Sequence, residues 1–91
     1  MHIGDDIARV RCNFGERLRS LRVERGLSQR ELGEIVSIDR TYILAVEKGR
    51  RNVSIDNIIK LSRGLDISVS ELCYGIEYDS RDADGLRLPI E

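Results

Sequence analysis

The side chains best suited to chemistry gather between Ser28 and Asn52, where basic, amide and hydroxyl groups are frequent. Arginine and lysine bind anions, and arginine also pairs with a guanine edge through two hydrogen bonds. Hydroxyl and amide groups hydrogen-bond phosphate oxygens or base edges. By contrast, the whole chain has one histidine, His2, and two cysteines, Cys12 and Cys73. These residue types favour recognition of a polyanionic partner over catalysis.

Neither catalysis nor metal binding is predicted. A four-ligand zinc site would need His2, Cys12 and Cys73 together with a carboxylate. The chain has no phosphate-binding glycine loop, no HExxH and no CxxC, and neither cysteine has a plausible histidine base. We therefore expect no catalytic residues, no metal, no cofactor and two reduced thiols.

The distribution of charge says more than the net value of −1. Residues 13–54 hold nine basic and six acidic side chains, a local balance of +3, whereas residues 75–91 hold two basic and five acidic ones, a balance of −3. A basic face can therefore exist in a chain that is almost neutral overall. An ordinary solvated mixture of charges explains the same counts.

Size and composition indicate one small helical domain. With 91 residues the chain can build a single modest core. One proline and 4% aromatic residues disfavour a β-sandwich. No apolar run is long enough to cross a membrane, and the start MHIGDD does not resemble a signal peptide, so we expect a cytoplasmic protein without membrane contact.

Apolar periodicity and capping residues predict an all-α chain with five helices. Their approximate ranges are 5–25, 29–36, 40–48, 55–63 and 69–74. Ser28, Asp39, Ser54 and Ser68 stand where each of the last four begins and can accept its unpaired N–H groups. Ser28 and Ser68 are each followed three residues later by glutamate, which is the pattern of a capping box.

The apolar residues of these helices predict which faces are inward. The expected inward and apolar positions are Ile7, Val10, Phe14, Leu18, Leu21, Leu32, Ile35, Val36, Ile43, Val46, Ile55, Ile58, Ile59 and Leu61. We divide the chain into an extension with the start of the first helix (1–12), a domain (13–74) and an acidic tail (75–91). That tail loses helical periodicity and is expected to be mobile, extended or associated with a dimer.

The run LSQRELGEIVSIDRTYILAVEKGRRNVSIDNIIKLSRGLDISVSEL, residues 27–72, resembles the Cro and phage-repressor (XRE) type of helix-turn-helix protein. The match covers about half the chain. Within it, DRTYI and the pattern of Glu47, Gly49, Arg51 and Asn52 are particularly similar to restriction–modification controller proteins, which are small dimeric regulators. The resemblance implies a five-helix lambda-repressor-like fold whose second and third helices form the helix-turn-helix.

A recognition helix reads bases with its first two turns, because that end points into the major groove. The expected base-contacting residues on the third helix are Arg40, Thr41, Leu44 and Ala45. Arg40 is the leading candidate and suits a guanine. Leu44 departs from the controller pattern, which has a small polar residue there. It can either contact thymine methyl groups or pack on protein.

Residues around that helix suit phosphates, which position a protein without reading sequence. The expected phosphate contacts are Ser28, Gln29, Tyr42, Lys48, Arg50, Arg51 and Asn52. The resemblance places the amide of Gln29 on DNA, and the N–H groups at the start of its helix favour an anion. Any one of these residues can equally be an idle surface side chain.

Three further positions are interpreted as structural. The resemblance implies an ion pair between Arg22 and Glu47 that ties the first helix to the end of the third. Ser37 replaces the usual turn glycine, and a left-handed backbone there costs roughly 1 kcal/mol. Gly33 replaces the usual alanine and preserves the close approach of the second and third helices, at a similar cost in helix propensity.

The predicted partner is double-stranded DNA, bound as an inverted repeat by a homodimer, because one recognition helix reads only a few base pairs. The candidate dimer surface, whose members suit core packing equally well, is Ile67, Val69, Leu72, Ile76 and Tyr78. Such a regulator acts by blocking or recruiting RNA polymerase. The alternative is an antitoxin or protein-interaction module whose acidic tail, residues 77–91, engages a basic partner.

Overall fold

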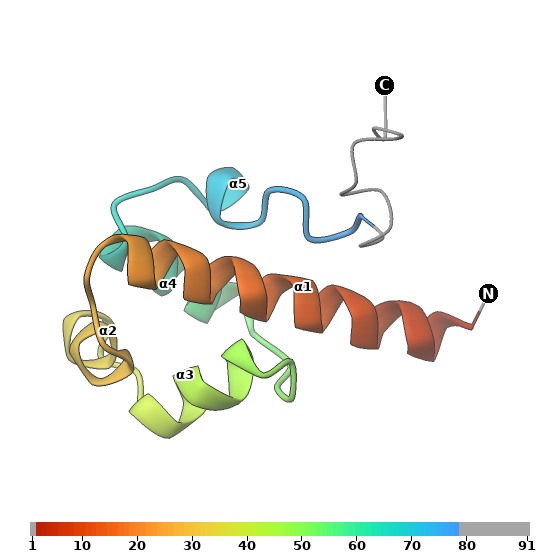
Figure 1. The fold of residues 1–91 in the computed structure, drawn as a ribbon, viewed down its shortest axis with the longest axis horizontal. Helices are drawn as coiled ribbons and strands as arrows, with labels where there is room; N and C mark the ends of the chain where they lie inside the picture. Colours follow the sequence, from red (N-terminus) through yellow and green to blue (C-terminus); the bar gives the residue numbers. More distant parts are fainter. Residues whose placement is uncertain (1, 79–91) are drawn as a thin grey trace.

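The computed structural model describes residues 2–78, which form five α-helices and no strand (Figure 1). The helices are α1 (Ile3–Glu24), α2 (Gln29–Val36), α3 (Arg40–Glu47), α4 (Ile55–Gly64) and α5 (Val69–Leu72). The predicted all-α class is confirmed. α1 begins two residues earlier than the sequence suggested, and α5 ends two residues earlier. Residues 79–91 of the expected tail lie outside the described residues. Within 2–78, no helix is both long and apolar enough to cross a bilayer.

The predicted caps explain where four of the helices begin. The hydroxyl of Ser28 accepts a hydrogen bond from the Glu31 amide, and the Glu31 carboxylate accepts one from the Ser28 amide, which completes a capping box. Asp39, Ser54 and Ser68 each accept a backbone N–H of α3, α4 and α5 respectively. Of the second predicted capping box, the hydroxyl half is present in the described part of the chain.

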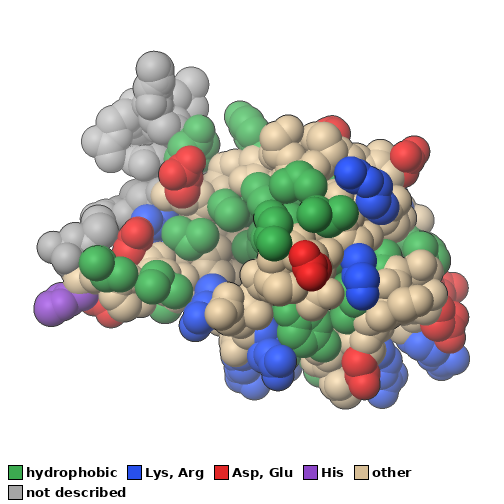
Figure 2. Space-filling model, turned by 180° about the vertical axis from the view of Figure 1, so that it is seen from behind, with side chains coloured by type: hydrophobic (Ala, Val, Ile, Leu, Met, Phe, Trp, Pro, Cys, Tyr) green, Lys and Arg blue, Asp and Glu red, His purple; other side chains and the backbone are tan. Residues whose placement is uncertain are grey.

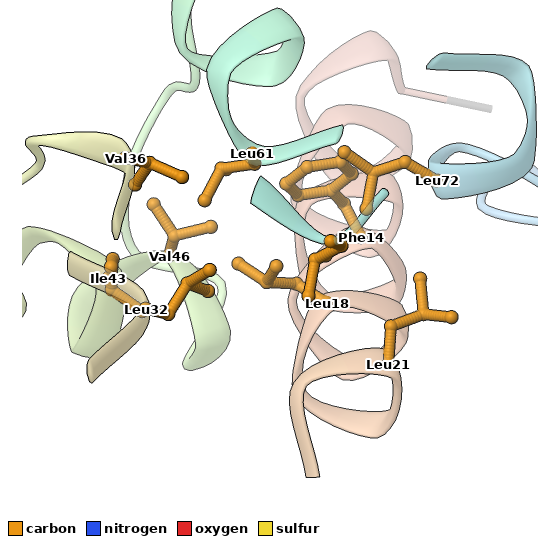
Figure 3. Packing of buried hydrophobic residues seen from close by; sticks show 10 residues of the cluster. Phe14, Leu18, Leu21, Leu32, Val36, Ile43, Val46, Leu61 and Leu72 are labelled. Carbon is orange, nitrogen blue, oxygen red and sulfur yellow. The ribbon is translucent and has the colours of Figure 1, made fainter. Parts of the chain in front are cut away.

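One hydrophobic core lies where all five helices converge, and its side chains point toward one another (Figure 3). The buried cluster is Phe14, Leu18, Leu21, Leu32, Val36, Ile43, Val46, Leu61, Leu65 and Leu72. Removing this apolar surface from water is the main force that orients the short helices. Because α3 contributes Ile43 and Val46 to the core, its opposite side is left for other contacts.

The expected burial of Ile35 is wrong. Ile35 is 55% exposed although Leu32 and Val36 on the same helix are buried. An eight-residue helix presents only a narrow stripe to the core, and α4 occupies that stripe through Gly64. On α4, Ile55 and Ile59 are also exposed, at 62% and 40%, so this helix has an apolar face that the described chain does not cover.

Gly15 allows α1 to lie directly against the end of α3. A Cβ at this position would stand 2.4 Å from the carbonyl oxygen of Val46 and 2.6 Å from that of Glu47. Such distances are far below van der Waals contact, and the obstructing atoms are backbone. The absence of a side chain at residue 15 therefore sets the distance between the longest helix and the helix predicted to read bases.

After α5 the chain runs back alongside α1 (Figure 1). Three polar side chains of α1, spaced four residues apart, hold its carbonyl groups. Arg17 donates to the carbonyl oxygen of Glu71 at 2.8 Å, and Asn13 donates to those of Ile76 and Tyr78, both at 2.8 Å. Arg9 donates to the carbonyl oxygen of Glu77 at 2.8 Å. The segment is fastened through its backbone.

Candidate nucleic-acid interface

The predicted base-contacting residues share the outer side of α3. Arg40 and Thr41 are exposed, Leu44 is 37% exposed and Ala45 is partly buried. Leu44 therefore lies on the accessible side of the helix and is absent from the core. Ile43 and Val46 face inward at 1% and 2% exposure, as the periodicity predicted. The arrangement gives α3 one packed side and one side free to enter a groove.

Asp39 arranges the first turn of α3 by bonding Thr41. One oxygen of its carboxylate, Oδ1, accepts the backbone N–H of Thr41 at 2.8 Å and its hydroxyl at 2.7 Å. These two bonds lower the pKa of Asp39 below its ordinary value, and nearby Arg40 lowers it further. With its proton directed at Asp39, the Thr41 hydroxyl offers lone pairs to an incoming donor such as a base amino group.

The loop after α3 is folded against that helix. The guanidinium of Arg51 lies over the ring of Tyr42, with its carbon 4.9 Å from the ring centroid. The Tyr42 hydroxyl donates to the carbonyl oxygen of Asn52 at 3.4 Å. A cation over an aromatic face is worth about 0.5–1 kcal/mol at an exposed site, enough to bias the orientation of an otherwise free arginine. Tyr42 thus acts on the loop and not only as an exposed side chain.

Arg22 and Glu47 form a buried ion pair, as the resemblance implied. The Arg22 Nε and Nη2 atoms donate to the two carboxylate oxygens of Glu47 at 2.6 and 3.0 Å, and Nη1 donates to the carbonyl oxygen of Leu27 at 2.7 Å. The hydrogen bond to Glu47 raises the pKa of Arg22 above its already high ordinary value. Residues from α1, α3 and the approach to α2 are joined in one cluster.

Gln29 takes part in this cluster, which sequence reasoning missed. Its Nε2 atom donates to Glu47 Oε1 at 3.0 Å. The two residues are 18 positions apart and lie on different helices, so no local spacing in the sequence signals the bond. The contact orients the amide of Gln29 at the start of α2, where the resemblance places a DNA contact.

The turn between α2 and α3 has the conformation that its residues suggested. Ser37 is left-handed, with φ of 59° and ψ of 47°. A Cβ at Gly33 would lie 2.5 Å from the carbonyl oxygen of Ile38, so the close approach of the turn to α2 requires glycine there. The turn fixes the angle at which α3 leaves the rest of the domain.

Basic side chains gather along the lower edge of the molecule in Figure 2, the edge that α2 and α3 occupy in Figure 1. The expected phosphate contacts Ser28, Lys48, Arg50, Arg51 and Asn52 are all exposed. Gln29 and Tyr42 are partly buried because each holds a protein contact as well. Arg30, on the first turn of α2, is exposed too and belongs to this surface although the sequence analysis did not name it.

The expected dimer surface needs correction at Leu72. That side chain is fully buried in the core of the monomer and has no area to offer a partner. Ile67, Val69 and Ile76 are partly buried, and Tyr78 is 36% exposed. Larger apolar exposure is found on α4, whose i and i+4 isoleucines could have been recognised from a hydrophobic face too wide for one core contact.

The cysteines are separate from this surface. Cys12 is exposed and Cys73 is partly buried, and burial raises the pKa of the Cys73 thiol. A raised pKa leaves less thiolate, the nucleophilic form. Within residues 2–78, no group of three or more His, Cys, Asp or Glu side chains is placed to hold a metal ion.

A short helix, a tight turn and a second helix with an exposed, basic-flanked start define a DNA-binding helix-turn-helix domain. The chain belongs to the Helix-turn-helix family HTH_3, whose model matches residues 18–72. The resemblance to the Cro and phage-repressor type is thereby confirmed.

Within this family, controller proteins of restriction–modification systems are similar to the chain. It is 44% identical over 69 residues to control protein C.MunI of a Mycoplasma species, covering 75% of this chain and 93% of that protein. The controller protein C.AhdI from Aeromonas hydrophila is similar in structure, with a TM-score of 0.67 and 50% identity over 68% of this chain and 94% of that one. C.Esp1396I, solved as a tetramer on its natural 35 base-pair operator, has a TM-score of 0.67 at 25% identity, over 75% and 93% of the two chains.

Proposed function

We propose that this protein is a sequence-specific transcription regulator that binds an inverted-repeat operator as a homodimer and controls a restriction–modification system. The observation that carries the proposal is the outer side of α3, where Arg40 and Thr41 are exposed while the opposite side is locked into the core. A rigid helix with a free polar start is what major-groove reading requires. The similarity to C.MunI and C.AhdI supports the controller role.

In the proposed complex, α3 enters the major groove with its N-terminal turns on the bases. Arg40 donates two hydrogen bonds to a guanine, Thr41 accepts from a base amino group, and Leu44 contacts a thymine methyl group. Ala45 leaves room for the DNA to approach. Asp39 stays on its cap because a phosphate would repel it. The reading therefore depends on a small number of side chains over a few base pairs.

Phosphates on both sides of the groove fix the position of α3. The first amides of α2, with Ser28 and Gln29, take one phosphate, since the start of a helix carries a partial positive charge. Tyr42 and the basic loop after α3, which includes Arg51, take phosphates on the other strand. These contacts supply affinity that falls with salt but do not distinguish sequences.

A homodimer follows from the limited reach of one recognition helix. Two copies related by a two-fold axis present two α3 helices to half-sites about one helical turn apart. The operator complex of C.Esp1396I supports binding by an assembly. On a promoter, such a dimer blocks RNA polymerase or recruits it by direct contact, and a cytoplasmic location follows from that role.

The direct test is selection of bound duplexes from a random pool, followed by titration of the selected site and a scrambled site at several salt concentrations. Enrichment of an inverted repeat, bound at least 100-fold more tightly than the scrambled duplex, is expected. Weak binding without enrichment would overturn the proposal. Co-purification of a basic protein with the chain would then favour the antitoxin or protein-interaction alternative.

A further inference from the structure

An apolar groove lies between the N-terminal half of α1 and the loop that follows α3. Its volume is about 460 Å³. Ile7, Val10 and Phe14 of α1 form one wall, Val53 and Ile58 lie opposite, and Ile76 closes one side. A cavity of this size and apolar character buries several large side chains. None of these positions belongs to the proposed DNA-reading side of α3.

A matching apolar projection stands next to the groove. Ile55 and Ile59 on α4 are 62% and 40% exposed, whereas Ile58 between them turns into the groove. One chain thus carries a concave and a convex apolar surface side by side. Two copies related by a two-fold axis can place each projection in the groove of the other, because a two-fold contact pairs residue i with j and j with i.

The charges around the two surfaces are complementary. Arg11 is exposed on the rim of the groove, and Asp56, next to Ile55 on the projection, is also exposed. The other acidic residue on the rim, Asp6, already pairs with Arg9. A second copy therefore brings an acidic group to a basic rim, whereas an unrelated apolar ligand has no such counterpart in the described chain.

We propose that this groove is the dimerisation site, and that it receives Ile55 and Ile59 of a second copy, with Asp56 of that copy against Arg11. The inference rests on the proposed function for the existence of the dimer, and it adds where the copies meet. Three of the groove residues on α1, Ile7, Val10 and Phe14, precede the part matched by the family model, residues 18–72. The N-terminal turns of α1, which extend past the other helices in Figure 1, therefore enlarge the interface beyond the shared domain.

The position of the groove agrees with the DNA-binding role. Arg51 and Asn52, proposed phosphate contacts, line its edge. A copy docked there lies beside the loop at the end of α3, so both recognition helices can approach one side of a duplex. An interface on the opposite side of the domain would hold the second α3 away from it.

Sedimentation equilibrium of the full chain without DNA tests the proposal. Ile7→Asp and Ile55→Asp are each expected to raise the dimer dissociation constant at least tenfold, because each change enters the interface twice. Val23→Asp is the control, since Val23 is 52% exposed on the same helix but outside the groove. Its constant should stay within about twofold. Circular dichroism melts verify that each variant is folded. Unchanged dimerisation in folded Ile7→Asp would overturn the proposal.

A charge exchange gives a test that does not depend on disrupting apolar packing. Arg11→Glu and Asp56→Lys should each weaken the dimer severalfold, and the double variant should recover most of the loss. Equal or additive weakening in the double variant would show that the two residues do not meet.

Photo-crosslinking identifies the occupant of the groove. A benzoylphenylalanine placed at position 7, in a mixture of ¹⁵N-labelled and unlabelled protein, should link to α4 of the other isotopic species. A link to residues 79–91 of the same chain, or no link, would contradict a second copy as occupant. Arg40→Ala separates the two proposals, because it should abolish operator selectivity while leaving the dimer intact. Dimer loss in groove variants without any selected DNA site would reject the regulator and retain the interface.

Discussion

Arg40 and Arg51 are both exposed arginines within a dozen residues of each other, yet their surroundings assign them different tasks. Arg40 stands on the first turn of α3 beside the Asp39 cap, whereas Arg51 rests on Tyr42 in the loop. A base-reading arginine contributes selectivity, and a phosphate-binding arginine contributes affinity for any duplex. The difference is measurable because salt dependence reports phosphate contacts.

Arg40→Ala is expected to weaken binding of the selected site by about 1–3 kcal/mol and to relax the preference at one base pair. Arg51→Ala is the matched control and should weaken all duplexes alike, lowering the salt slope by about one. Fluorescence anisotropy with cognate, single-substituted and scrambled duplexes measures both. Equal losses on cognate and scrambled DNA for Arg40→Ala would remove it as a base reader.

Glu47 serves three helices through one carboxylate, so its loss is expected to be costly. Glu47→Ala leaves the Arg22 guanidinium buried without a partner and should lower the free energy of unfolding by about 3–5 kcal/mol. Replacing both residues, as Arg22→Met with Glu47→Leu, should recover most of this stability because no unpaired charge remains. Urea denaturation gives the values. A double variant as unstable as Glu47→Ala would contradict an electrostatic origin.

At the scale of the elements, contact between α1 and α3 depends on a missing side chain. Gly15→Ala is expected to destabilise the fold by about 1–3 kcal/mol, since the new methyl group meets the backbone carbonyls that end α3. Gly4→Ala, on the same helix with nothing within 4 Å of its Cβ, should be neutral or slightly stabilising. Thermal melts compare the two. Equal effects would mean that helix propensity, not packing, governs position 15.

The caps of α2 and α3 predict loss of stability in acid. A bond from the Ser28 backbone N–H lowers the pKa of Glu31, and the bonds from Thr41 lower that of Asp39. A carboxyl whose pKa is lower in the folded state contributes stability above its unfolded pKa, near 4, and loses it as the pH falls through the folded value. Asp39→Asn retains a cap that does not titrate.

Wild-type protein should therefore lose its advantage over Asp39→Asn as the pH falls below about 4. Denaturation curves at pH 7, 4, 3 and 2.5 provide the comparison. A constant difference at all four values would show that the Asp39 cap does not contribute through its charge.

Much of this element structure could be predicted because it is local. Ser28, Asp39, Ser54 and Ser68 act within three residues of themselves, and the left-handed turn at Ser37 follows from the short connection between two helices. Burial at Ile35 could not be predicted in the same way. Whether an apolar residue at the margin of a stripe is covered depends on where another helix lies, which no local pattern contains.

For the whole molecule, the candidate site was predictable in its types and less so in its connections. The basic and polar residues on α3 and its flanks follow from spacing and resemblance. The bond from Gln29 to Glu47, the stacking of Arg51 on Tyr42 and the burial of Leu72 arise from tertiary packing. Long-range contacts of this kind also create the groove, because its residues come from four separate parts of the chain.

The way α1 holds the segment after α5 has an evolutionary consequence. Arg9, Asn13 and Arg17 grip carbonyl oxygens, which every amino acid possesses. Apart from Ile76, which packs against the core, side chains there can drift without loosening the attachment. Related proteins can therefore diversify the outer surface of this segment and acquire new partners there, while the DNA-reading half of the domain remains unchanged.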